Sequence, residues 1–327
     1  MKVLVVGGAG YIGSHAVLAL EAGGHEAWVF DNLFQGHRAA VPQGRLIVGD
    51  LLNADELSRL LDEGGFDAVM HFAALALVGE SVTQPALYYR NNVVGTLNLM
   101  DAMRNAGVWR FVFSSTCATY GTPEKVPIAE STPQHPINPY GFTKLAIEHA
   151  LADYAAAYGF GYAALRYFNA AGAHHSGTIG EDHDPETHLI PLILQVALGH
   201  RPKITIYGDD YPTSDGTSIR DYIHVEDFCD THVRALERLE QGVGLKLNLG
   251  TGQGFSVRQV IDACRDVTGH AISTEIGPRR PGDPPELVAD RSLAQRVLDW
   301  GCRSSDIRQI VASAWNWHQH HPLGYGE

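Results

Sequence analysis

The chain has 327 residues, of which 45% are hydrophobic and 19% charged, and its formal net charge is −13. This composition is that of a globular protein with a sizeable core, and it excludes a disordered or collagen-like chain. The length suits two domains better than one. An acidic chain is also a poor candidate for binding nucleic acid or anionic membranes, because phosphate-rich partners select clustered Lys and Arg.

Three further features indicate the cellular compartment. The N-terminus enters a short strand-like segment rather than a long apolar signal segment, and no apolar run reaches the ~20 residues that a spanning helix needs. The four cysteines, Cys117, Cys229, Cys264 and Cys302, show no CxxC spacing, which favours free thiols. We therefore expect a cytoplasmic protein with no membrane and no nucleic-acid partner.

The first half of the chain alternates short apolar segments with segments of helical period. This pattern predicts strands at 3–6, 25–30, 45–48, 67–70, 110–113 and 162–166, and helices at 11–22, 53–63, 93–104 and 140–158. Asn53 is the candidate N-cap of the second helix. Repeated β-α alternation predicts an α/β fold with a Rossmann-like, doubly wound parallel sheet.

The alternation weakens after about Asn169. Gly, His, Asp and Pro crowd residues 170–187, a helical segment follows at 189–198, and polar loops come next. Residues 220–239 and 246–249 resemble a helix and a strand that return to the main sheet. We therefore expect a Rossmann domain over 1–170 and a smaller C-terminal substrate-binding domain over 171–327, with parts of 220–250 returning to the sheet.

Seventeen histidines raise the question of a metal site. The densest groups are His174-His175 and His318, His320 and His321, and neither has HExxH or similar spacing. Metal ligation needs a defined spacing and supporting partners, so we expect no metal.

The strongest local signal is the glycine-rich segment from Gly7 to Gly13, which follows the first strand and opens the first helix. It satisfies GxGxxG through Gly8, Gly10 and Gly13, and GxxGxxG through Gly7, Gly10 and Gly13. Such glycines permit a tight turn and close approach to a pyrophosphate, and the helix N-terminus offers free N–H groups to that anion. The segment predicts dinucleotide binding, whereas a glycine turn for packing alone is the less specific alternative.

Asp31 stands near the end of the second strand, where the ribose-binding acid of such folds belongs. A carboxylate accepts hydrogen bonds from a ribose 2′-OH and repels a 2′-phosphate, so NAD is favoured over NADP. Asp50, at the end of the third strand, is a second candidate near the adenine. A role for Asp50 in capping its own loop explains its position almost as well.

Tyr140 and Lys144 form a YxxxK pair that follows the fifth strand. The four-residue spacing places both on one face of a helix. A lysine ammonium near a phenol favours the phenolate, which moves a group with an ordinary pKa of about 10 towards the working pH of a general base.

Ser114, Ser115 and Thr116 follow Phe113 at the carboxyl end of the fifth strand. Ligands of open α/β sheets bind at these ends, so Thr116 is a candidate partner of a substrate hydroxyl. Hydrogen bonding within a turn is the alternative role of this segment.

Together these motifs resemble the extended short-chain dehydrogenase/reductase family, and in particular its members that epimerise UDP-sugars at C4. The resemblance runs from end to end and includes these segments: His71-Phe-Ala-Ala, Val78-Gly-Glu-Ser81, Tyr89-Arg-Asn-Asn92, Arg166-Tyr-Phe-Asn169, Gly180-Glu-Asp182, Asp210-Tyr-Pro-Thr213, Arg220-Asp-Tyr-Ile-His-Val225, Asn248-Leu-Gly250, Pro278-Arg-Arg280 and His321-Pro-Leu-Gly-Tyr325.

The resemblance implies an isomerase with tightly bound NAD, acting on UDP-glucose and UDP-galactose through a 4-keto intermediate. Tyr140 would exchange the proton of the sugar 4-OH, Lys144 would bind the nicotinamide ribose and tune Tyr140, and Thr116 would lie beside the 4-OH. The resemblance also implies a homodimer.

Two sets of binding residues follow from the same resemblance. The cofactor set is Gly7, Gly10, Tyr11, Ile12, Gly13, Asp31, Asn32, Leu33, Phe34, Gln35, Gly36, Asp50, Leu51, Phe72, Ala73, Ala74, Asn91, Ser114, Tyr140, Lys144 and Phe168. The substrate set is Thr116, Tyr140, Asn169, His188, Leu189, Tyr207, Arg220, Arg280, Asp283 and Leu287. Arg220 and Arg280 suit a diphosphate because guanidinium groups pair with its oxygens in fork geometry.

Three positions depart from the family pattern. Ala76 replaces a lysine that some members place near the cofactor phosphate, and His188 replaces a substrate-binding asparagine. Leu287 stands where the family gates N-acetylated sugars, and its bulk predicts that an acetamido group is disfavoured.

Three alternatives remain at this point. A UDP-xylose/UDP-arabinose 4-epimerase would use the same C4 chemistry and differ only around C6. A nucleotide-sugar 4,6-dehydratase would carry Asp-Glu after the threonine, where Cys117 and Ala118 stand here. A non-catalytic NAD-binding protein would be expected to have lost Tyr140 or Lys144.

Overall fold

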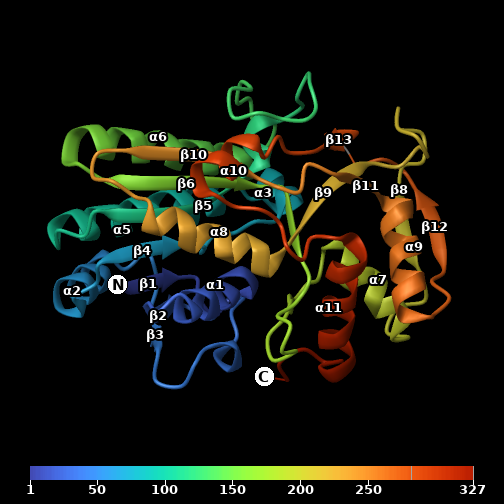
Figure 1. The fold of residues 1–327 in the computed structure, drawn as a ribbon, viewed down its shortest axis with the longest axis horizontal. Helices are drawn as coiled ribbons and strands as arrows, with labels where there is room; N and C mark the ends of the chain where they lie inside the picture. Colours follow the sequence, from blue (N-terminus) through green and yellow to red (C-terminus); the bar gives the residue numbers. More distant parts are fainter. Residues whose placement is uncertain (281, 327) are drawn as a thin grey trace.

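The computed structural model describes residues 1–280 and 282–326. A seven-stranded sheet forms the larger lobe (Figure 1), with the strand order β10-β6-β5-β4-β1-β2-β3 and parallel pairing throughout. Its strands are β1 (Lys2–Val6), β2 (Glu26–Asp31), β3 (Leu46–Val48), β4 (Ala68–His71), β5 (Arg110–Thr116), β6 (Gly161–Tyr167) and β10 (Gly244–Leu249). The predicted Rossmann-like fold is confirmed.

Helices cover both faces of this sheet. Val3 and Val5 of β1 pack into a core shared with α1 (Tyr11–Ala22), α8 (Val225–Glu237) and α10 (Ser292–Leu298). Leu4 and Val6 point the other way, into a core shared with α2 (Ala54–Gly64), α5 (Gly95–Asn105) and α6 (Pro139–Tyr158). Successive side chains of a strand alternate between faces, and because both faces are buried the strand is apolar throughout rather than alternating.

The strands predicted in the first half all form, with ends shifted by a few residues. Asn53 caps α2 by accepting the Glu56 N–H at 3.3 Å. Short segments connect the longer elements: η1 (Arg38–Ala40), α3 (Val78–Thr83), α4 (Pro85–Tyr88), the π-helical turn η2 (Tyr89–Val94) and the 3₁₀ turn η3 (Cys117–Tyr120). The helix predicted to begin at residue 93 is therefore the last part of a longer, irregular helical segment that begins before that residue.

The second lobe has its own core and its own small sheets. One sheet comprises β7 (Asn169–Ala171), β9 (Ile219–His224), β11 (Gly254–Ser256) and β13 (Glu286–Leu287), and a separate pair comprises β8 (Ile204–Tyr207) and β12 (Thr274–Gly277). Helices α7 (Leu189–Ala197), α9 (Val257–Thr268) and α11 (Ile307–His320) enclose the core (Figure 1). The polar loops expected after 198 therefore contain several regular elements.

One predicted helix is wrong in its first part. Residues 219–224 form β9, which pairs with β7, β11 and β13, and only the later part of 220–239 is helical. Pairing with strands remote in sequence overrides the local periodicity here. After β9 the chain returns to the larger lobe, where α8 packs on α1 and β10 pairs with β6.

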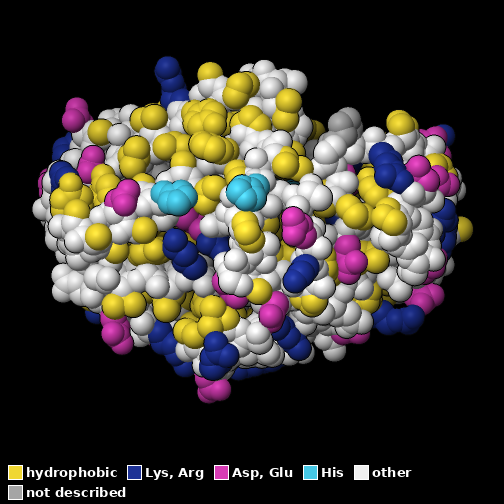
Figure 2. Space-filling model, turned by 90° about the horizontal axis from the view of Figure 1, so that it is seen from above, with side chains coloured by type: hydrophobic (Ala, Val, Ile, Leu, Met, Phe, Trp, Pro, Cys, Tyr) yellow, Lys and Arg dark blue, Asp and Glu magenta, His cyan; other side chains and the backbone are white. Residues whose placement is uncertain are grey.

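The face in Figure 2, seen from the side of α6 and β10, carries interspersed acidic and basic side chains and a patch of hydrophobic ones. Within the described part of the chain, no helix combines the length and the apolar character needed to cross a membrane.

Candidate functional site

A cavity of about 490 Å³ lies where the carboxyl ends of the main strands face the second lobe. Its walls include the ends of β1, β2, β4, β5 and β6, so it lies across the β1–β4 switch point where open α/β sheets bind ligands. Most members of the two predicted sets line it. The exceptions are Leu33, Ser114, Lys144, Tyr207, Arg220 and Arg280.

The glycine turn at one end of the cavity tolerates no side chains at two of its positions. Gly7 has φ +80°, and a Cβ there would lie 2.4 Å from the Ala73 nitrogen, while a Cβ on Gly13 would lie 2.0 Å from the Gly7 oxygen. Gly10, which lines the cavity, would meet nothing of the described chain closer than 3.5 Å. The backbone is therefore tightly packed at Gly7 and Gly13, whereas the space beside Gly10 is open towards the cavity.

Helix α1 begins at this turn in a form suited to an anion. Its N-cap is Gly10, no side chain caps it, and its first turn carries no acidic residue. The first N–H groups of a helix lack intrahelical acceptors and form the positive end of its dipole. The residues present therefore fit a dinucleotide pyrophosphate.

Asp31 is held by two backbone groups at the end of β2. Oδ2 accepts the Ala9 N–H at 3.0 Å and Oδ1 accepts the Leu33 N–H at 2.8 Å. Burial raises the pKa of Asp31, and the two hydrogen bonds partly oppose that shift. Leu33 has φ +60° and turns the loop rather than lining the cavity. Each carboxylate oxygen keeps a lone pair for a ribose hydroxyl.

Asp50 lines the cavity and also caps its own loop. Oδ1 accepts the Leu52 N–H at 2.8 Å, and Oδ2 accepts a hydrogen bond from Asn32 Nδ2 at 3.1 Å. Both roles weighed for Asp50 are thus compatible with its position.

Tyr140 sits in the first turn of α6, which Asn138 caps by accepting the Gly141 N–H at 2.8 Å. The tyrosine is 5% exposed and lines the cavity together with Thr116. Burial raises the pKa of Tyr140 well above 10, the neighbouring Tyr167 raises it further, and hydrogen bonding with Thr116 lowers it. The phenol is therefore positioned to donate its proton or to share it with a hydroxyl.

Lys144 lies one helical turn further along α6, behind the cavity wall. Its Nζ donates to the Ser114 carbonyl at 2.8 Å. This contact behind the wall explains why neither Lys144 nor Ser114 lines the cavity. Burial lowers the pKa of Lys144 to about 7, against the attraction of Glu148. A nearby ammonium favours a phenolate, but burial dominates here and shifts the pKa of Tyr140 in the opposite direction.

The second lobe supplies the facing wall. Asn169, His188, Leu189, Asp283 and Leu287 of the substrate set line the cavity. The other second-lobe members of the set, Tyr207, Arg220 and Arg280, do not line the cavity and form pairs beside it. Arg220 Nη2 lies 2.5 Å from Asp283 Oδ1, and the Arg280 guanidinium stacks over Tyr207, 4.3 Å from the ring centroid.

The structure adds lining residues that the two predicted sets do not contain, notably Tyr167, Glu181 and His183. Tyr167 ends β6 directly opposite Thr116 of β5. The rule that selected Thr116, a polar side chain at a strand's carboxyl end, also applies to Tyr167. Glu181 and His183 do not end a strand; Glu181 lies within a segment quoted for the family resemblance, but no role is assigned to it.

Comparison with known proteins is consistent with this geometry. The model of the NAD dependent epimerase/dehydratase family matches residues 3–250. A UDP-glucose 4-epimerase of Halalkalibacterium halodurans is 52% identical over 326 residues, covering 99% of this chain and 98% of that protein.

Two solved structures share the whole fold. UDP-glucose 4-epimerase from Brucella ovis in complex with NAD has a TM-score of 0.92 and 50% identity, covering 96% of this chain and 97% of that one. UDP-glucose 4-epimerase from Bifidobacterium longum in complex with NAD⁺ and UDP has a TM-score of 0.95 and 39% identity, covering 99% and 100%. The relation predicted from the motifs is confirmed, and the chain belongs to the NAD dependent epimerase/dehydratase family.

Proposed function

We propose that this chain is an NAD-dependent enzyme that interconverts UDP-glucose and UDP-galactose by inverting C4. The observation that carries the proposal is a buried Tyr140 beside Thr116, at the floor of a cavity that the glycine turn and the second lobe share. Family membership and the relatives at about half identity support the same reaction.

The larger lobe holds the cofactor. The first N–H groups of α1 would hold the pyrophosphate, and the Asp31 carboxylate would hold the adenosine ribose, which favours NAD over NADP. NAD, when bound, supplies a reversible hydride acceptor for the sugar C4. Asp31 and Tyr140 line the same cavity, so the residues that would hold the cofactor and the candidate proton-transfer group serve one site.

Tyr140 is the group that exchanges the proton of the sugar 4-OH. Thr116, which hydrogen bonds with Tyr140, orients the sugar 4-OH. A proton that leaves O4 therefore has an acceptor within the same buried cluster. In its protonated form Lys144, one helical turn behind the phenol, would favour the phenolate when a proton must be taken up; its lowered pKa of about 7 limits that form to pH values near or below neutrality.

The second lobe binds the nucleotide half of the substrate. Asn169, Leu189 and Leu287 face the sugar region, while Arg220 and Arg280, with Asp283 and Tyr207, would hold the diphosphate and uridine. Holding the substrate at this remote end leaves a 4-keto sugar, whose C4 is trigonal, free to turn and present the other face of that carbon to the same Tyr140. Inversion at C4 follows without a second acid–base residue.

The site argues against the dehydratase alternative. Elimination of water across C5–C6 needs an additional acid and base. Cys117 is buried, and burial raises the pKa of its thiol to about 12, while its neighbour Ala118 has no ionisable group. Neither residue can perform that proton transfer near neutral pH.

We also propose a homodimer. Val82, Leu87, Tyr89, Val94 and Phe142 are each at least 40% exposed, and they lie on α3, α4, η2 and α6, which pack against one another. A contiguous exposed apolar surface of this kind marks an association site. Light scattering of the wild type and of Val94→Lys tests it, and a wild type that stays monomeric at micromolar concentration contradicts it.

The test of the function is a substrate panel without added NAD. Protein purified without NAD in its buffers should release NAD on denaturation and convert UDP-galactose to UDP-glucose. UDP-xylose and UDP-N-acetylglucosamine complete the panel. Turnover of UDP-xylose well above that of UDP-galactose would favour the pentose alternative, and no conversion of any UDP-sugar would reject the proposal.

A further inference from the structure

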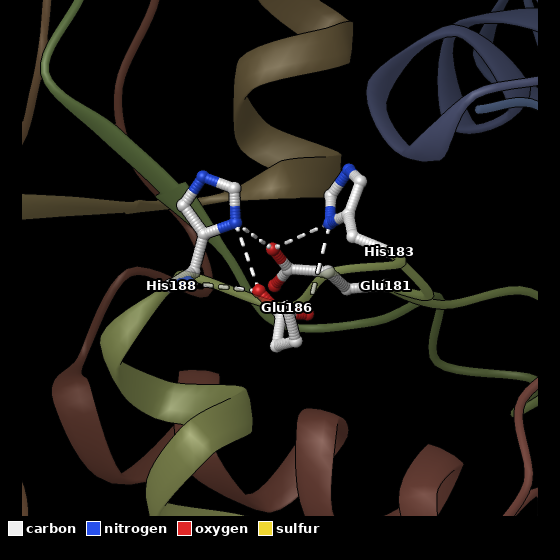
Figure 3. Close-up of side chains that lie close together, drawn as sticks. All are labelled: Glu181, His183, Glu186 and His188. Atoms are coloured by element: carbon white, nitrogen blue, oxygen red, sulfur yellow. Dashed lines mark hydrogen bonds and ion pairs between the residues drawn. The ribbon is translucent and has the colours of Figure 1, made fainter. Parts of the chain in front are cut away.

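Two histidines and two glutamates converge in the loop between β7 and α7. Glu181, His183, Glu186 and His188 each offer a ligand atom, and these atoms all lie within 4.8 Å of one another. Figure 3 shows both imidazole rings turned towards the two carboxylates between them, with each ring's second nitrogen pointing away from the cluster. No role proposed above for Glu181, His183 or Glu186 accounts for this arrangement.

The closest contacts within the cluster are comparable to the distances between neighbouring ligands of a metal ion. His188 Nδ1 lies 2.8 Å from Glu181 Oε1 and 3.2 Å from Glu186 Oε1. His183 Nδ1 lies 3.4 Å from Glu181 Oε1 and 3.7 Å from Glu186 Oε2. Zinc binds nitrogen and carboxylate ligands at about 2.0–2.2 Å, which places neighbouring tetrahedral ligands roughly 3.3–3.6 Å apart. Three of the four contacts lie close to this range, and the shortest, between His188 and Glu181, would lengthen when a metal ion enters.

These short distances are ion-pair contacts between the imidazoles and the carboxylates. Glu181 Oε1 and His183 Nδ1 are buried and have no hydrogen-bond partner, although each has an ionisable neighbour within 3.5 Å. Glu181 is 4% exposed. A buried polar atom without a partner is unfavourable, and a cation between the four atoms would satisfy the lone pairs that converge there.

The second histidine and glutamate cluster of the molecule behaves differently. His175 Nδ1 forms an ordinary hydrogen bond of 2.6 Å with Glu226 Oε1, and the His175 side chain is 78% exposed. Its third member, His174, has a hydrogen bond with Ser176. That cluster is already satisfied, so proximity of His and Glu does not by itself produce the open arrangement at 181–188.

Backbone groups hold one of the ligands in place. Glu186 Oε1 accepts the N–H groups of Thr187 and His188 at 2.7 and 2.8 Å. Such hydrogen bonds to a ligating carboxylate are typical of metal sites because they fix its orientation. The ligands all come from residues 181–188, so the loop folds around the site.

We propose that Glu181, His183, Glu186 and His188 bind one divalent transition-metal ion, with zinc as the best match. Two imidazole nitrogens and two carboxylate oxygens suit this borderline ion, and two carboxylates balance its charge. Because four protein ligands close a tetrahedral site, the ion has a structural role rather than a place in the reaction.

The site would brace a loop that joins three parts of the molecule. Asp184 O accepts a hydrogen bond from Gln35 Nε2 at 3.0 Å, and His37 Nε2 lies 3.2 Å from Asp182 O, so the loop touches the cofactor-side loop of the larger lobe. Asp182 Oδ2 accepts the Tyr325 N–H at 2.9 Å near the end of the chain. A metal ion at its centre would hold this junction together.

The test measures metal content and thermal unfolding of the full-length protein. Wild type dialysed with a chelator and then supplied with Zn²⁺ alone should take up one equivalent and unfold at a higher temperature. His183→Gln and Glu186→Gln should each weaken zinc binding by more than the roughly 10–100-fold that follows loss of a supporting partner. Glutamine at 186 can still accept the two backbone N–H groups, so its effect reports ligation.

His175→Gln is the matched control and should keep full zinc binding. Cobalt(II) in place of zinc should give the intense visible absorption of a tetrahedral complex. The proposal is overturned if wild type takes up no zinc, if His175→Gln loses zinc as the 183 and 186 variants do, or if cobalt shows the weak spectrum of an octahedral complex. In the first case the cluster is a network of protonated histidines and carboxylates.

Discussion

The two walls of the cavity are built in different ways. On the larger-lobe side, Tyr140, Lys144 and Thr116 are buried and anchored to β5 and α6. On the second-lobe side, the side chains are more exposed and are held mainly by charge pairs, such as Arg220 with Asp283. The comparison shows that the larger-lobe wall is buried and rigid, which suits the proposed proton transfer, and that the second-lobe wall is more exposed and adaptable, which suits the proposed choice of substrate.

Buried charged side chains also lie behind the larger-lobe wall and hold it in place. Arg166 of β6 and Glu148 of α6 form an ion pair of 2.5 Å, with side chains 2% and 1% exposed. Arg166 also donates to Tyr120, whose hydroxyl donates to Asn248 on β10. This network ties α6, which carries Tyr140 and Lys144, to the sheet.

The largest effect is expected at the phenol. Tyr140→Phe removes the proton acceptor and keeps the ring, so turnover should fall by about 10²–10⁴-fold while far-ultraviolet circular dichroism and NAD content stay unchanged. Leu189→Ala on the opposite wall should change KM more than kcat. If Tyr140→Phe retains full kcat, the rigid wall is not where the proton moves.

Next comes the buried pair behind that wall. Glu148→Gln leaves the Arg166 charge buried without a counter-charge, which should lower the free energy of unfolding by about 3–5 kcal/mol, measured by urea denaturation. Asp283→Asn breaks the more exposed pair of the second lobe and should lower it clearly less. Equal losses would mean that the two walls do not differ in rigidity as described.

A pH-dependent effect follows from Lys144. Its pKa is lowered to about 7 in the folded protein, against about 10.4 in an unfolded chain. Between these values the unfolded state binds more protons, so this residue makes the free energy of unfolding rise with pH from about 7 to about 10. The stabilisation is complete above that range and is lost as the pH falls through 7.

Denaturation of wild type and Lys144→Met at several pH values isolates this contribution. The difference between the two should grow in favour of wild type across the range. Parallel curves would show that Lys144 is not the buried, readily deprotonated lysine described.

The smallest effect is expected on the adaptable wall. Leu287→Ala enlarges the sugar region, so kcat/KM for UDP-N-acetylglucosamine should rise relative to UDP-glucose by about 10-fold, the lower end of what pocket size discriminates. Wild type that already turns over the N-acetylated sugar well would show that Leu287 does not gate it.

Local patterns in the sequence accounted for most of the larger lobe. Strands, helices and the glycine turn there follow from apolar periodicity and from backbone conformations that only glycine adopts, as at Gly7. The same patterns place Asp31, Thr116 and Tyr140 along the cavity, because carboxyl ends of parallel strands meet at one edge.

Other features depend on contacts between residues distant in the chain. β9 is a strand because β7, β11 and β13 surround it, and Tyr167 meets Thr116 only through pairing of β5 with β6. The pKa shifts of Tyr140 and Lys144 come from burial that no spacing reveals.

The sequence by itself determined the fold of the larger lobe, favoured NAD and singled out Tyr140 as the candidate for proton transfer, because the strand and helix periodicity, the glycine turn with Asp31, and the YxxxK spacing are local patterns. Only the tertiary structure decided how the 181–188 loop closes, since its spacing fits no known metal pattern and its four side chains converge through the fold of the loop between two lobes. Tertiary packing also set which charges are buried, and therefore which groups change their proton affinity.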